Sequence, residues 1–137
     1  MIWVVVDTNI IVSALLQPLG PPAQIFERFL SGAFQLCVSG TIYAEYEEVI
    51  SRPRFQRSDE TITQTLKVIR EKGCWVRPVT SIHVCPDPDD DIFLECAATA
   101  QAQYLVTGNL KHFPAIWGGT RIVTARGLLE ILSNAPG

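Results

Sequence analysis

Two acidic residues, Asp7 and Glu45, occupy positions that ordinary structural roles do not fully explain. Asp7 follows the β-branched run 2–6, which predicts a strand buried on both faces and ending at this carboxylate. Glu45 lies three residues after Ile42, on the apolar stripe of a predicted helix. Asp7 could serve only as a helix N-cap, and Glu45 could reach water from the edge of its stripe. Otherwise, a buried carboxylate of this kind needs a partner or a cation.

A dense group of acids begins another predicted helix. Asp87, Asp89, Asp90 and Asp91 fall within five residues. Helix capping and the helix dipole account for two of them. Two carboxylates about 4 Å apart repel each other by roughly 4 kcal/mol at an effective dielectric constant of about 20. A divalent cation would relieve this repulsion, and Glu95, one turn after Asp91, could face the same way.

These acids are predicted to meet at one edge of a sheet. Asn109 lies two residues beyond the predicted strand 104–107. Ligands of parallel α/β sheets bind at the carboxyl ends of the strands, where we expect Asp7, Glu45, Asp91 and Asn109 to converge. Their ligand atoms would all be oxygen, which favours Mg²⁺ or Mn²⁺ over zinc or copper. Such clusters commonly act on phosphate esters.

The elements that position these residues alternate between strand and helix. This order predicts a single α/β domain over residues 1–137, a three-layer α/β/α sandwich around a mostly parallel five-stranded sheet. Trp3 and Trp75 fall in predicted strands and are expected in the core. The predicted strands are 2–6, 34–38, 74–79, 104–107 and a core at 122–123; the predicted helices are 10–16, 23–31, 41–51, 58–72, 88–102 and 125–132.

The composition argues against a protein that coats nucleic acid, a membrane-spanning protein and a secreted protein. Eleven basic and fourteen acidic residues give a net charge of −3, so any contact with nucleic acid must be local. No apolar run reaches the ~20 residues that a membrane span needs, and the N-terminus has no signal-peptide pattern, so we expect a cytoplasmic protein. The four cysteines form no C-x-x-C pair and are expected to be buried, reduced thiols.

Four segments resemble the motifs of one family, the PIN-domain nucleases, and especially the toxin-type members of prokaryotic toxin–antitoxin pairs. The resemblance covers nearly the whole chain, from Ile2 to about Ile131. The segments, in order, are Val4–Ala14, Ser39–Glu45, Asp87–Leu94 and Tyr104–Asn109. It implies a Mg²⁺- or Mn²⁺-dependent endoribonuclease with an RNA substrate, an antitoxin partner and a homodimeric state.

The resemblance also implies roles for individual residues. Asp7, Glu45 and Asp91 would bind the metal and act in catalysis together with Asn109. Asn109 stands where the family often has Asp, so it can ligate through its carbonyl oxygen but brings no charge. Supporting positions would be Asn9, Ser13, Ser39 and Thr107, with Glu95 as a possible proton acceptor.

Basic residues outside these motifs could contact phosphates. They are Arg52, Arg54, Arg57, Lys111 and His112; a solvated loop is the favoured interpretation of the arginines, and for Lys111 and His112 the two interpretations stand equal.

Three alternatives compete with the nuclease. Asn109 leaves open a weak or inactive PIN-like module that binds RNA or protein. A small-molecule phosphatase would be expected to carry a second Asp two residues after the first, where this chain has Asn9. A dinucleotide-binding domain is disfavoured because no G-x-G-x-x-G follows the first strand.

Overall fold

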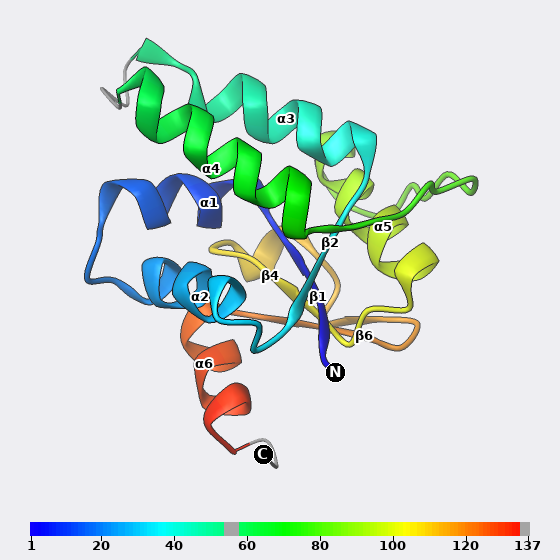
Figure 1. Ribbon diagram of the computed structural model, residues 1–137. Coiled ribbons are helices and arrows are strands. Elements are labelled where there is room, and N and C mark those ends of the chain that lie inside the picture. Colours follow the sequence, from blue (N-terminus) through cyan, green and yellow to red (C-terminus); the bar gives the residue numbers. More distant parts are fainter. Residues whose placement is uncertain (54–57, 135–137) are drawn as a thin grey trace.

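The computed structural model describes residues 1–53 and 58–134, which fold around a six-stranded sheet (Figure 1). The strand order is β3-β2-β1-β4-β6-β5. Neighbouring strands are parallel except for β5, which is antiparallel to β6. The strands are β1 (Trp3–Val6), β2 (Gln35–Val38), β3 (Cys74–Trp75), β4 (Tyr104–Val106), β5 (Ile116–Trp117) and β6 (Thr120–Val123).

Helices flank this sheet and complete the predicted three-layer arrangement. Figure 1 shows α1, α2 and α6 on one side, while α5 packs against β1, β2 and β4 from the other. The α-helices are α1 (Thr8–Leu16), α2 (Pro21–Leu30), α3 (Gly40–Ile50), α4 (Asp59–Lys72), α5 (Asp91–Ala100) and α6 (Ala125–Asn134). Two short 3₁₀ turns, η2 (Pro88–Asp90) and η3 (Leu110–His112), lie near the carboxyl ends of the strands. No helix of the described chain is long and apolar enough to cross a membrane.

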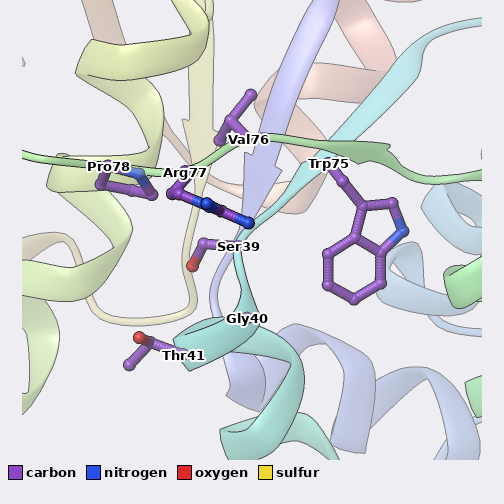
Figure 2. Close-up of a pocket in the computed structure, with 7 residues that line it drawn as sticks. All are labelled: Ser39, Gly40, Thr41, Trp75, Val76, Arg77 and Pro78. Atoms are coloured by element: carbon purple, nitrogen blue, oxygen red, sulfur yellow. The ribbon is translucent and has the colours of Figure 1, made fainter.

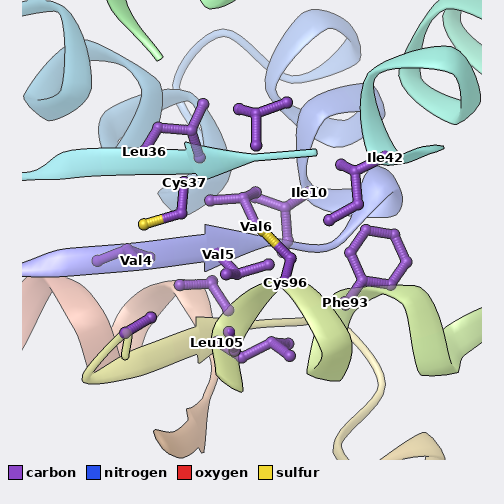
Figure 3. Packing of buried hydrophobic residues seen from close by; sticks show 14 of the residues in the cluster. Val4, Val5, Val6, Ile10, Leu36, Cys37, Ile42, Phe93, Cys96 and Leu105 are labelled. Carbon is purple, nitrogen blue, oxygen red and sulfur yellow. The ribbon is translucent and has the colours of Figure 1, made fainter. Parts of the chain in front are cut away.

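The central strand β1 is buried on both faces, as its continuous β-branched run predicts. Val4 and Val5 have no exposed surface and Val6 has only 2%. Figure 3 shows these valines packed among residues of the neighbouring strands and of α5, including Leu36, Leu105, Phe93 and Cys96. Burial of Val4–Val6 fixes the position at which the strand ends, and therefore the position of Asp7.

Parts of the sheet differ from the prediction. The sheet has six strands because β5 forms a short hairpin with β6, whose turn contains Gly118 in the left-handed region (φ 56°) that glycine adopts freely. Strand β3 covers only Cys74 and Trp75, because its partner β2 ends at Val38, opposite Trp75. Trp75 is 44% exposed, so its placement in the core was wrong.

All four cysteines are free thiols, as expected. Cys37 and Cys96 are fully buried, and burial raises the pKa of each thiol to about 12. Cys74 and Cys85 are only half-buried, so the expectation of burial holds for two of the four.

Candidate metal centre

Asp7 lies at the carboxyl end of β1, beside the end of β4. Although it occupies the N-cap position of α1, its side chain makes no capping hydrogen bond. Its Oδ2 instead accepts a hydrogen bond of 2.7 Å from the hydroxyl of Thr107, which directly follows β4. The carboxylate is 6% exposed, and burial raises its pKa while the hydrogen bond from Thr107 partly offsets that rise. Asp7 therefore faces the junction of the two strands.

Thr8, the residue after Asp7, holds Glu45 next to Asp7. The Thr8 hydroxyl donates a hydrogen bond to Glu45 Oε2. On α3 the core-facing positions are filled by Ile42, Tyr46 and Ile50, and Glu45 lies half-buried at the edge of that stripe. Burial, reinforced by the charge of Asp7, raises the pKa of Glu45. The two carboxylates thus lie close enough to affect each other's ionisation.

The carboxylate of Asp91, the predicted third acid, is hydrogen-bonded to the backbone of the segment before α5. Its Oδ1 accepts hydrogen bonds from the backbone amides of Val84 (3.2 Å) and Cys85 (2.9 Å). Although burial acts in the opposite direction, these bonds lower the pKa of Asp91. Glu95, one turn later, accepts a hydrogen bond of 2.9 Å from the amide of Ile82. Both acids therefore hold the segment before α5.

Asp90 is the half-buried acid of the run, and it interacts electrostatically with Asp7 and Glu45; the charge of the exposed Asp89 also acts on Glu45. Burial raises its pKa to about 6, and the charges of Asp7 and Glu45 add to that rise. Its Oδ2 is buried and, within residues 1–53 and 58–134, has no hydrogen-bond partner. His112 Nδ1 lies 3.3 Å from this oxygen. The sequence analysis placed Asp90 in the acidic run but not among the metal ligands, because the run alone does not show which of its side chains lies nearest the other acids.

The remaining predicted residues surround this cluster at different distances. Asn109 is exposed, and its backbone amide donates to Thr107 Oγ1 (3.0 Å), so Thr107 bridges Asp7 and the start of η3. Asn9 Oδ1 accepts a bond of 3.3 Å from the Gly108 amide. Ser39 caps α3 by accepting from the Ile42 amide at 3.2 Å. Ser13 is half-buried on α1.

Among the predicted phosphate contacts, His112 lies nearest the acids. Lys111 is exposed on η3 beside it. Arg52 lies at the opposite end of α3 from the sheet edge and pairs with Glu48 at 2.9 Å. Arg54 and Arg57 lie outside the described residues.

The chemistry of the acids fits a divalent cation. Asp7, Glu45 and Asp90 are oxygen donors whose charged forms are disfavoured by burial and mutual repulsion. In the described part of the chain, no three His, Cys, Asp or Glu side chains already converge closely enough to hold an ion. Binding would therefore draw the carboxylates together, and Asp90 Oδ2, which has no hydrogen-bond partner in the described residues and lies 3.3 Å from His112 Nδ1, offers an oxygen ligand.

The fold and this cluster define an open, mostly parallel α/β protein with its acids at the carboxyl edge of β1. Residues 3–111 match the family model of the PIN domain, and the chain therefore belongs to the PIN domain family. The resemblance noted in the sequence is thereby confirmed.

Similar proteins agree with this assignment. An uncharacterized protein of Methanocaldococcus jannaschii is 28% identical over 111 residues, which are 79% of this chain and 71% of that protein. The crystal structure of VapBC2 from Rickettsia felis, bound to a DNA fragment from its promoter, matches 90% of this chain and 98% of the compared chain, with TM-score 0.60 and 16% identity. VapBC-1 from nontypeable Haemophilus influenzae matches 82% of this chain and 90% of the compared chain, with TM-score 0.53 and 19% identity.

Proposed function

We propose that this chain is a Mg²⁺- or Mn²⁺-dependent endoribonuclease and the toxin of a toxin–antitoxin pair. The observation that carries the proposal is the group Asp7, Glu45 and Asp90, whose pKa values are all raised and whose Asp90 Oδ2 has no hydrogen-bond partner in the described chain. Three such carboxylates at a sheet edge are stabilised by a cation. Membership of the PIN domain family supports the nuclease class.

Each residue has a role that follows from its contacts. Asp7 and Glu45, oriented by Thr107 and Thr8, would hold the cation together with Asp90. A bound divalent cation supplies Lewis acidity, which activates water and offsets the charge that develops on the phosphate. Because Glu95 is hydrogen-bonded to Ile82, we assign the acceptance of the water's proton to Asp90. Asn109, exposed at the rim, would meet the substrate, and Asp91 would hold the segment before α5.

The first experiment measures cleavage of single-stranded RNA. The purified protein should cleave with Mg²⁺ or Mn²⁺ and stop when the metal is chelated. Asp7→Asn and Glu45→Gln should each reduce the rate by on the order of 100-fold or more, because ligands of one ion act as a unit. Glu47→Gln is the matched control, since Glu47 is exposed on the same helix. A rate that is unchanged in Asp7→Asn, or equally lost in Glu47→Gln, would refute the proposed site.

The toxin role is supported by the names of the similar structures, which are VapBC complexes. We propose by analogy that this chain has an antitoxin partner, forms a homodimer and acts in the cytoplasm. Induced expression in a bacterial host should arrest growth, and Asp7→Asn should abolish the arrest. Equal toxicity of both proteins would show that the acids are not responsible.

A second candidate function is a PIN-like module that binds RNA or protein without cleaving. Two observations favour it: the fourth position is the neutral Asn109, and the acids do not yet converge on one point. RNA binding without cleavage in every metal tried, with equal binding by a variant lacking Asp7, Glu45 and Asp90, would establish this function instead.

A further inference from the structure

A pocket of about 480 Å³ opens on the same edge of the sheet as the acids, at the ends of β2 and β3 (Figure 2). It lies outside the carboxylate cluster, and none of its residues takes part in the roles assigned above except Ser39. Its walls are the start of α3 and the segment that follows β3, lined by Ser39, Gly40, Thr41, Trp75, Val76, Arg77 and Pro78.

Trp75 gives this pocket a fixed aromatic wall. The indole Nε1 donates a hydrogen bond of 3.0 Å to the carbonyl of Arg70, and the ring packs on Tyr43 with centroids 5.3 Å apart. The side chain nevertheless remains 44% exposed. An exposed indole held from one side is a suitable surface on which a nucleobase can stack.

Arg77 gives the pocket a free cation. Figure 2 shows its guanidinium between Trp75 and Pro78, over the start of α3. In the part of the chain that the structure describes, no carboxylate pairs with it. A protein of net charge −3 thus presents an unpaired guanidinium beside an aromatic ring, and this combination matches the phosphate and base of one nucleotide.

The pocket lies close enough to the acids for one strand of RNA to contact both. Thr41, in its wall, and Glu45, in the cluster, lie four residues apart on α3, which corresponds to about 6 Å of helix rise and to one face of the helix. Arg52, which the sequence suggested for phosphate binding, is at the far end of the same helix and already paired. Arg77 is therefore the better placed cation.

We propose that this pocket is a nucleotide subsite for single-stranded RNA, in which Arg77 binds a phosphate and Trp75 stacks on a base next to the scissile bond. The inference rests on the proposed function for its substrate class. It adds two residues that bind RNA outside the metal centre and that would determine how the strand is aligned.

The test is RNA binding in the presence of EDTA, which separates binding from cleavage. The probes are a short oligoadenylate and the same strand with one abasic position, measured by fluorescence anisotropy over a range of salt. Arg77→Ala should weaken binding about tenfold and reduce the slope of log K against log[salt] by about 0.7, the value for one lost phosphate contact on a single strand. The control is Arg121→Ala, which should change neither, because Arg121 is exposed on β6, three strands away from β2 in the sheet.

Trp75 is tested by a pair of variants. Trp75→Leu should weaken binding of the intact strand about tenfold and remove its advantage over the abasic strand, whereas Trp75→Phe should retain both. Thermal melts of the two Trp75 variants identify any loss of folding. Because Arg77 is exposed, Arg77→Ala tests the pocket even if a Trp75 variant fails to fold.

The outcomes separate this inference from the proposed function. Weaker RNA binding by Arg77→Ala and Trp75→Leu would support the subsite even if the wild type cleaved no RNA with Mg²⁺ or Mn²⁺. Wild-type affinity and salt slope in both variants would overturn the subsite even if the wild type cleaved RNA. Loss of polyglutamate binding in Arg77→Ala, with RNA binding unchanged, would assign the pocket to an acidic protein segment and also overturn it.

Discussion

Asp90 and Asp91 are adjacent in the chain but have opposite electrostatic environments. Asp91 is stabilised in its charged form by amides of the preceding segment, which lower its pKa. Asp90 has a pKa of about 6 because it is buried near other carboxylates. One residue corresponds to about 100° around a helix, which is enough to direct one side chain to the backbone and the next to the cluster.

Replacing Asp90 should therefore affect cleavage, whereas replacing Asp91 should affect stability. Asp90→Asn should remove most metal-dependent cleavage and leave the melting temperature unchanged or higher. Asp91→Ala should cost about 2–3 kcal/mol of unfolding free energy, because two amides lose their acceptor, while the remaining folded protein stays active. Urea unfolding and activity per folded molecule measure both effects. The reverse pattern would restore Asp91 as the catalytic acid.

The raised pKa values of Asp7, Glu45 and Asp90 also predict how stability depends on pH. The folded state binds these protons more tightly than the unfolded chain, so unfolding free energy should fall as the pH rises above the ordinary carboxyl pKa, and for Asp90 this fall extends to its folded-state pKa of about 6. The contribution of Asp91 has the opposite sign but is lost only below its ordinary pKa of 3.8.

Asp7→Asn should accordingly stabilise the metal-free protein at pH 7 and reduce the fall in stability as the pH rises from pH 4 to pH 7. Urea unfolding at these two pH values in EDTA gives the measurement, with Glu47→Gln as the control. A clear loss of stability in Asp7→Asn at pH 7 would mean that the carboxylate is needed by the fold.

At the scale of elements, α5 holds the segment that precedes it with two carboxylates one turn apart. Asp91 binds the amides of Val84 and Cys85, and Glu95 binds that of Ile82. The segment has little regular structure between β3 and η2, so these side-chain contacts replace the backbone pairing that a strand would provide.

Removing one of these contacts should loosen the segment locally. Glu95→Ala should speed chemical labelling of the half-buried Cys85 thiol, by about tenfold, with a much smaller change in global stability. Labelling of the buried Cys37 provides an internal reference in the same sample. Unchanged Cys85 labelling would show that Asp91 alone holds the segment.

Helices and strands with a clear hydrophobic periodicity and with capping residues at their ends were predictable from the sequence, whereas very short strands were not. The predicted helices 41–51 and 58–72 agree with α3 and α4 to within one residue at each end, and the structure shows Ser39 and Ser58 capping their starts. The two-residue strands β3 and β5 are too short for any periodicity, and their pairing depends on neighbours distant in sequence. The same limit applied to Asp90 and Trp75, because the direction of a side chain at an element's end is set by tertiary packing.

At the scale of the whole molecule, a cation at the carboxylate cluster should stabilise the fold, because the ion binds only where the acids are brought together. At a metal concentration about ten times Kd the gain is about 1.4 kcal/mol, or a rise in melting temperature of roughly 5 °C. Thermal melts with and without Mg²⁺ and Mn²⁺ measure it. Asp7→Asn should lose most of the rise, and a wild type indifferent to both ions would argue against a metal centre.

The two outermost strands, β3 and β5, are each only two residues long. An exposed strand edge is where copies of a protein can add to each other's sheets and aggregate, and short edges offer few unpaired backbone groups for this. The sheet is therefore protected against growth from both sides. Any self-association of this protein should use the outer surfaces of its helices, and concentrated solutions should not form fibrils through the native sheet.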